Sequence, residues 1–400
     1  MVNQLPAETT TFIGREAELG KTISLLESSR LVTVAGPGGV GKSRLAMRAA
    51  RQVSANYADG VVLAKLDAIN DPDLVTTALA ANLRDKNLLL LLDSCEHVAQ
   101  ACGRLARTLL DAAPGVRILA TSQWPLSQPG ERVLRIGPLT VPEVRNLTEA
   151  RDLDAVKLFA DRAVAAWPGF VINEDNWARV VRLCRLLDGL PLAVELAAAW
   201  LRVLPLHEIL SKADDRFRLL VRRNGFGPPR HRSLLATVRR SYELCSTPDR
   251  LLWARLSVFR GTFDPAAAES ICDGTEEALS RLVDRSIVVT DTERYWMLDT
   301  LREYGREQLQ ASSMDSELSL RHSAYFMRPA EHAEANRDED QLTKREQQVA
   351  TLAAQGLTNR EMAIRLGIAQ RTAETHVNRI LHKLNLRSRI DLAGWQQAVD

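Results

Sequence analysis

The sequence contains few cysteines and no long hydrophobic run. Its five cysteines are an odd number without a CxxC pair, which argues against a disulfide framework or a zinc site and favours a reducing cytoplasm. The apolar run at 88–92 is far too short to span a bilayer, and residues 1–20 lack the apolar region of a secretory signal. We therefore expect a cytoplasmic protein that does not contact a membrane.

The composition is that of an ordinary globular protein, with 46% hydrophobic and 26% charged residues among 400. This length favours two or three packed units. The net charge of +2 is unevenly placed, because residues 341–400 hold nine Lys and Arg against five Asp and Glu. A basic end on a slightly acidic body suggests a nucleic-acid-binding end, although a solvated charged surface would look the same.

The first third of the chain alternates short apolar runs with amphipathic stretches. This rhythm predicts an α/β unit with a parallel sheet and helices on both faces. The expected strands are 31–35, 61–66, 88–93 and 116–121, and the expected helices are 43–53, 74–83 and 105–112.

The middle of the chain reads as helical. Residues 142 to about 220 show helical spacing of apolar residues, and Gly227-Pro228-Pro229 then marks a boundary. Further helices and a two-stranded turn, 287–289 against 295–297, are expected before residue 310.

A glycine-rich segment follows the first expected strand. Residues 36–43, Gly-Pro-Gly-Gly-Val-Gly-Lys-Ser, fit the phosphate-loop pattern GxxxxGK[ST] and precede an expected helix. The backbone N–H groups and the helix N-terminus favour a polyphosphate, Lys42 reaches its β- and γ-phosphates, and the Ser43 hydroxyl ligates Mg²⁺. The expected contacts with ATP or ADP in this segment are Gly36, Gly38, Gly39, Val40, Gly41, Lys42, Ser43 and Arg44.

Two further strands of the expected sheet end in polar residues. Asp93 closes the run of leucines at 88–92. It is the expected catalytic residue, whose carboxylate binds Mg²⁺. The alternative is that it caps the next helix. The strand at 116–121 is followed by Ser122 and Gln123, and its tip is expected beside the first strand, where it could sense the γ-phosphate.

Several motifs together resemble the NB-ARC class of signal-transduction ATPases, the STAND proteins. They are Thr-Phe-Ile-Gly-Arg-Glu at 11–16, Leu-Asp-Ser-Cys-Glu-His at 92–97, Leu-Ala-Thr-Ser at 119–122 and Gly-Leu-Pro-Leu-Ala at 189–193. The resemblance implies a nucleotide domain, a helical domain and a winged helix, with ADP or ATP at their junction and a switch between closed and open forms. It also implies that Pro191 lies near the adenine or ribose and Arg15 near the base.

The sequence departs from that family at positions that act on phosphate. Gln123 stands where relatives carry a γ-phosphate-binding Arg, and Leu298 stands where they carry a β-phosphate-binding His. No second acid directly follows Asp93. Nucleotide binding is therefore better supported than hydrolysis, and the chain is at most a slow ATPase.

The C-terminal residues predict a helix-turn-helix. Thr343 and Glu346 form a capping box for a helix that Gly356 ends, and Thr358 caps a second helix at 359–366. A turn at 367–368 leads to a third helix at about 370–384, whose apolar face is Ala373, Val377, Ile380, Leu381 and Leu384.

This C-terminal region closely resembles the LuxR-type helix-turn-helix, here expected to have four helices. The resemblance implies binding to double-stranded promoter DNA in bacteria, usually as a dimer or other homo-oligomer. The DNA-binding residues that it implies are Asn359, the base-facing Glu374, Thr375 and Asn378, and the phosphate-contacting Arg371, Arg379 and Lys383.

We thus expect a transcription regulator whose nucleotide-binding body controls a DNA-binding end. The alternatives are a regulator whose degenerate nucleotide site serves as a dimerisation or ligand-docking scaffold, and a slow ATPase. The expected domains are the phosphate-loop domain at 1–138, the helical domain at 139–222, the winged-helix-like domain at 223–310, a helix and linker at 311–341, and the DNA-binding domain at 342–400.

Overall fold

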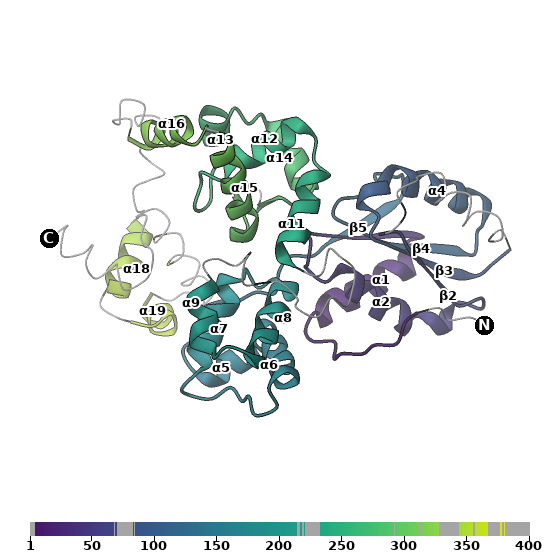
Figure 1. Cartoon of the computed structure of the whole chain (residues 1–400), viewed down its shortest axis with the longest axis horizontal. Coiled ribbons are helices and arrows are strands. Elements are labelled where there is room, and N and C mark those ends of the chain that lie inside the picture. The colour runs from purple at the N-terminus through teal and green to yellow at the C-terminus, as the bar shows by residue number, and fades with distance from the viewer. Residues whose placement is uncertain are drawn as a thin grey trace. The chain divides into compact units, whose positions relative to one another are not determined.

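The computed structural model divides the chain into two compact units, Met1–Tyr325 and Phe326–Asp400 (Figure 1). It describes residues 5–67, 69, 83, 85–213, 217, 220, 233–291, 293–312, 314–327, 344–354, 357–366, 377 and 380. The division into five domains stays a prediction.

The first unit contains a five-stranded sheet in the order β2-β3-β4-β1-β5. Its neighbouring strands all pair in parallel, which confirms the predicted α/β fold. The strands are β1 (Leu31–Ala35), β2 (Val61–Lys65), β3 (Leu88–Asp93), β4 (Val116–Ser122) and β5 (Glu131–Arg135). The edge strand β5 was not predicted, because its charged residues leave little apolar signal.

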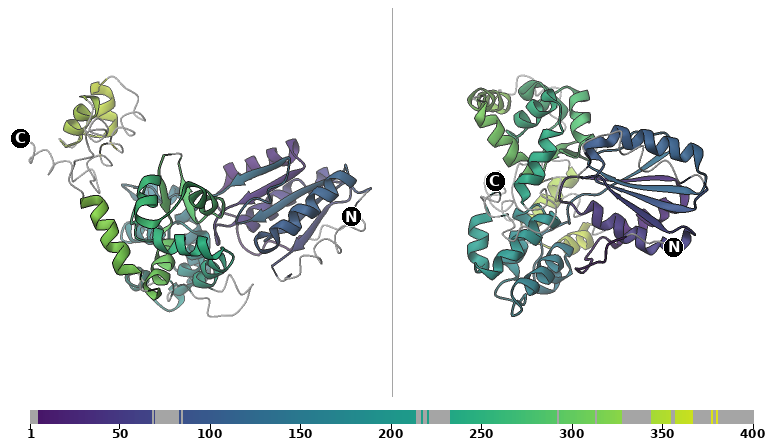
Figure 2. Two further views of the ribbon diagram at one scale, coloured as in Figure 1. Left: turned by 90° about the horizontal axis from the view of Figure 1, so that it is seen from above. Right: turned by 45° about the vertical axis from the view of Figure 1, so that its right-hand side comes forward.

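Helices cover both faces of this sheet (Figures 1 and 2). Leu89 and Leu91 of β3 pack with α1 (Glu16–Ser28) and α2 (Lys42–Gln52), and the alternate leucines of β3 pack with α4 (Ala99–Ala112). Burial on both faces explains why β3 reads as an unbroken apolar run. Helix α4 begins earlier than predicted, and the predicted helix at 74–83 lies outside the described residues except for Leu83.

The helical part that follows includes α8 (Pro191–Ala199). Proline begins this helix, where its missing N–H is not needed, and most of its later residues are buried. The other helices of this part are α5 (Leu147–Asp152), α6 (Asp154–Ala166), α7 (Trp177–Leu186) and α9 (Leu206–Lys212), and α8 packs mainly on α6.

The remaining part of the first unit combines helices with the predicted two-stranded turn, β6 (Val288–Thr290) paired antiparallel with β7 (Tyr295–Met297). The helices are α11 (Leu234–Glu243), α12 (Thr247–Leu256), α13 (Pro265–Cys272), α14 (Glu276–Asp284), α15 (Asp299–Ala311) and α16 (Asp315–Met327), whose last two residues belong to the second unit. Four of these helices, α11 to α14, each begin with a side-chain oxygen that accepts from a backbone amide of the first turn. The capping residues are Ser233, Ser246, Asp264 and Thr275, in that order.

The second unit contains α18 (Lys344–Ala354) and α19 (Asn359–Leu366). The Thr358 hydroxyl accepts from the Glu361 amide at 3.3 Å, and the Glu361 carboxylate accepts from the Thr358 amide at 2.6 Å. This capping box confirms the predicted start of α19. Val377 and Ile380 are buried against both helices, as their predicted place on the core face requires.

The five cysteines are free and buried, in agreement with the absence of a disulfide framework. Burial raises the pKa of the Cys184 thiol to about 12 and that of Cys245 to about 11. These thiols therefore stay protonated at neutral pH and act as small apolar side chains. Among the described residues, none of the helices has the length and apolar character needed to cross a membrane.

Trp253 offers a test of the packing between α12 and α15. Its ring is fully buried, and its Nε1 donates to the Leu301 carbonyl at 2.9 Å. Trp253→Phe should lower the free energy of unfolding by about 1–3 kcal/mol, because it leaves a void and a buried carbonyl without a donor. Urea denaturation followed by circular dichroism measures the change.

The half-exposed Trp167 is the matched control, and Trp167→Phe should change stability by less than about 0.5 kcal/mol. Equal losses in both variants would refute this packing.

Candidate functional site

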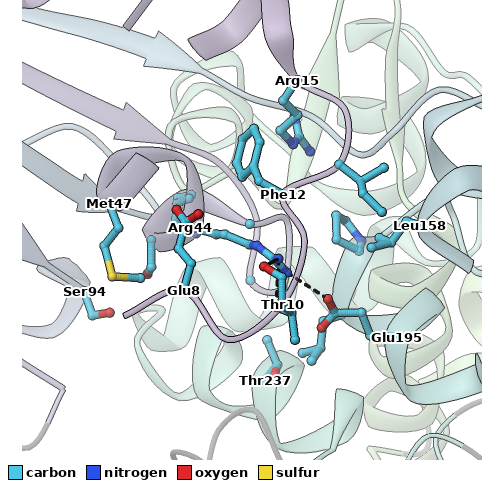
Figure 3. A pocket seen from close by; sticks show the side chains of 18 of the residues that line it. Glu8, Thr10, Phe12, Arg15, Arg44, Met47, Ser94, Leu158, Glu195 and Thr237 are labelled. Atoms are coloured by element: carbon cyan, nitrogen blue, oxygen red, sulfur yellow. Dashed lines mark hydrogen bonds and ion pairs between the residues drawn. The ribbon is translucent and has the colours of Figure 1, made fainter. Parts of the chain in front are cut away.

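A pocket of about 360 Å³ lies beside the phosphate loop (Figure 3). Three parts of the first unit contribute to its walls: the N-terminal segment with the loop and α2, the start of α8, and α11. Of the predicted nucleotide contacts, Gly36 and Val40 are not in the lining. The predicted contacts that line it are Arg15, Gly38, Gly39, Gly41, Lys42, Ser43, Arg44 and Pro191.

The phosphate loop connects β1 to α2, as predicted. Gly39 and Gly41 adopt φ values of 79° and 99°, which residues with a side chain rarely adopt. The Lys42 ammonium donates to the carbonyls of Gly36 and Pro37 at 2.8 and 2.9 Å. The lysine is therefore held beside the loop, close to where a phosphate would lie.

Asp93 lies at the end of β3 and is almost fully buried. Its Oδ1 accepts from the Thr121 hydroxyl at 2.6 Å, and the same hydroxyl accepts from the Ser94 amide at 2.9 Å. The expectation that Asp93 caps the next helix is wrong, because neither η2 (Glu96–Val98) nor α4 has a side-chain cap. Asp93 is not in the pocket lining, whereas Ser94 and Glu96 are. Its Mg²⁺ role stays a prediction.

Gln123 follows β4 and lines the pocket with a neutral side chain. Strand β4 pairs with β1, so Gln123 lies on the predicted side of the loop. Its carbonyl accepts from the Ser286 hydroxyl at 2.8 Å, and the Arg285 guanidinium lies 4.8 Å from the centre of the Trp124 ring. The tip of β4 therefore contacts the turn before β6.

Arg15 binds the backbone of the phosphate loop. Its guanidinium donates to the Val40 and Gly137 carbonyls at 2.9 and 2.7 Å and pairs with Glu18 at 2.9 Å. Burial lowers the pKa of this guanidinium from its ordinary value, and Glu18 opposes the shift. The contact of Arg15 with a base stays a prediction.

The N-terminal segment forms one wall of the pocket, which the sequence did not indicate. Arg44 of α2 donates to the Thr10 carbonyl at 2.8 Å and pairs with Glu195 of α8 at 3.2 Å (Figure 3). Glu8 pairs with Arg48 at 2.9 Å and with Arg51 at 2.7 Å. These contacts join residues far apart in the sequence, so no local pattern could have revealed them.

The Gly-Leu-Pro motif connects the loop to α15. The Leu192 amide donates to the Gly39 carbonyl at 3.1 Å. Just before the motif, the Asp188 carboxylate accepts from the backbone amides of Asp299 and Thr300 at 3.0 and 2.7 Å. A carboxylate at a helix N-terminus is favourable, so Asp188 stabilises the start of α15.

The predicted DNA-binding residues are almost all beyond what the structure describes. Asn359 is the first residue of α19. The predicted contacts outside the described residues are Arg371, Glu374, Thr375, Asn378, Arg379 and Lys383.

The chain is similar to several known proteins. The bacterial regulatory proteins of the luxR family match residues 340–395. The uncharacterised protein Rv0894 of Mycobacterium tuberculosis is 34% identical over 350 residues, which are 80% of this chain and 86% of that protein. The chain belongs to this mycobacterial protein's family. Residues 340–395 form its LuxR-type domain, and its body contains a parallel five-stranded sheet with a phosphate loop after the first strand.

Two further likenesses are partial. The HTH-type transcriptional regulator Rv0890c of Mycobacterium tuberculosis is 36% identical over 332 residues, which are 76% of this chain and only 36% of that protein. A solved Walker-type ATPase of Pyrococcus abyssi shares 13% identity and a TM-score of 0.47, over 76% of this chain and 98% of that one.

Thr121 offers a test of the contacts around Asp93. Thr121→Val keeps the shape of the side chain but removes the hydroxyl that binds both Asp93 and the Ser94 amide. We expect the free energy of unfolding to fall by about 1–3 kcal/mol, because two buried groups lose a partner. The control is Thr108→Val on the exposed side of α4, which should cost less than about 0.5 kcal/mol. Urea denaturation measures both changes. An unchanged midpoint for Thr121→Val would contradict the hydrogen bonds of Thr121 with Asp93 and Ser94.

Proposed function

We propose that nucleotide bound to the first unit controls promoter binding by the LuxR-type domain. The observation that carries the proposal is the contact of the phosphate loop with two other parts of its unit, Leu192 of α8 and Thr237 of α11. A nucleotide in this pocket would touch all three parts at once. Whether ATP or ADP is bound can therefore change how these parts pack. Such a change could reach the DNA-binding domain, which follows them in the chain.

The chemistry of the pocket fits ATP or ADP. Its volume of about 360 Å³ lies within the range of small-molecule sites. The glycine loop, the start of α2 and Lys42 supply the donors and the positive charge that a polyphosphate needs. Ser43 and Asp93 are the residues that would hold Mg²⁺, which would neutralise phosphate charge when bound.

Gln123 favours control by binding over control by turnover. It places no positive charge at the tip of β4, and charge neutralisation is a large part of phosphoryl-transfer catalysis. Two alternatives stand beside the proposal: a nucleotide site that serves only as a dimerisation or docking scaffold, and a slow ATPase. We further propose that the protein acts in the cytoplasm and binds DNA as a homo-oligomer.

Lys42 tests whether the pocket binds nucleotide. Lys42→Ala should weaken binding of ATP and ADP by roughly 100-fold, because a charged donor to the phosphates is lost. Isothermal titration of the full chain with each nucleotide and Mg²⁺ measures this. Lys86→Ala removes an exposed lysine that pairs with Asp59 and is not in the pocket lining, so both affinities should stay unchanged. Equal affinities of wild type and Lys42→Ala would reject the site.

The predicted third helix of the LuxR-type domain can be tested by separating base contacts from phosphate contacts. Asn378→Ala should reduce the binding free energy by about 1–3 kcal/mol on a duplex selected by the wild-type protein and change it little on a scrambled duplex. Lys383→Ala should weaken both complexes alike and reduce the salt slope by about one unit. Fluorescence anisotropy at several salt concentrations gives both quantities. The assignment fails if the two variants lose the same affinity on both duplexes and change the slope equally.

A further inference from the structure

Five positively charged side chains line the nucleotide pocket, and four of them are bound by protein groups. These four are Arg15, Lys42, Arg44 and Arg51. The fifth, Arg240, is different: its Nε is buried without a hydrogen-bond partner, and no carboxylate among the described residues pairs with it. A buried polar atom without a partner lowers the stability of the fold, and a bound ligand that accepts from Arg240 would remove this penalty.

Arg240 belongs to α11, the helix that contacts the phosphate loop. A Cβ built on Gly38 would lie 2.6 Å from the Thr237 Cγ2, so α11 touches the loop backbone directly. The Ser241 hydroxyl lies 3.5 Å from the same point. Arg240 is three residues after Thr237, and residues at this spacing are neighbours on one helix face. Its side chain thus lines the pocket from the helix that borders the phosphate loop.

The tip of β4 contributes no cation to the pocket. Gln123 lines the pocket at the tip of β4 and is neutral, and the acidic Glu96 also lines it. A terminal phosphate bound here would have Lys42 on the loop but no positive charge from β4. The guanidinium of Arg240 presents several N–H donors in a fixed plane, which suits phosphate oxygens.

We propose that Arg240 binds the terminal phosphate of ATP and so supplies, from α11, the charge that Gln123 does not. This inference rests on the proposed nucleotide-binding function and assigns to one residue the distinction between ATP and ADP. Because ADP lacks the terminal phosphate, only ATP gives the Arg240 guanidinium its partner. The difference between ATP and ADP is then a difference in contacts with α11, the helix that begins the last part of the first unit.

The test compares Arg240→Met with Arg239→Met in the full chain. Arg239 is the next residue of the same helix, but it is exposed and pairs with Glu243 at 3.0 Å, so it is the matched control. Isothermal titration with ADP and with the β,γ-methylene analogue of ATP, both with Mg²⁺, gives the two affinities. Arg240→Met should weaken binding of the analogue by about 10–100-fold and binding of ADP by less than about threefold. Arg239→Met should leave both affinities unchanged, and Arg240→Lys, which keeps the charge, should fall between wild type and Arg240→Met.

The outcomes separate the two proposals. If the wild type binds neither nucleotide, both the proposed function and the role of Arg240 are rejected. If the wild type binds both but Arg240→Met changes neither affinity, or weakens ADP as much as the analogue, the pocket stands and the role of Arg240 is rejected. Thermal melts of the apo proteins accompany the titrations, and Arg240→Lys decides the case if Arg240→Met fails to fold.

Discussion

The phosphate loop is the one segment that the rest of the first unit depends on, because two other parts of the unit pack directly on its glycines. A side chain at Gly38 would collide with Thr237, and one at Gly39 would press on Leu192 at 3.1 Å. Glycine is therefore needed here for close packing as well as for the turn of the backbone. Anything that shifts this loop must shift α8 or α11 with it.

A continuous series of contacts leads from the loop into the last part of the unit. Leu192 bonds to Gly39, and Asp188 at the preceding turn holds the N-terminus of α15. Ser286 reaches the tip of β4 from the other side. Two routes therefore join the pocket beside the phosphate loop to the elements that precede the LuxR-type domain in the chain. They give the proposed control a physical path within the first unit.

The sequence predicted the parts of this protein that have local signals. The leucine run of β3, the glycines of the loop and the capping residues at Thr358 each carry a short pattern with one physical cause. The pattern failed for β5, where charged residues mask an edge strand. It could not show the wall formed by residues 6–12, the hold of Asp188 on α15 or the place of Arg240. These depend on partners distant in the sequence, whose meeting only the packed structure shows.

In the proposed function, nucleotide binding and DNA binding are coupled. The most direct measurement is the affinity of the full chain for its selected duplex when it is saturated with ADP or with the β,γ-methylene analogue of ATP. We expect the two affinities to differ by about 5-fold or more, in the range of known couplings, and the difference to disappear in Lys42→Ala. Equal affinities in the two nucleotide forms of the wild type would contradict it.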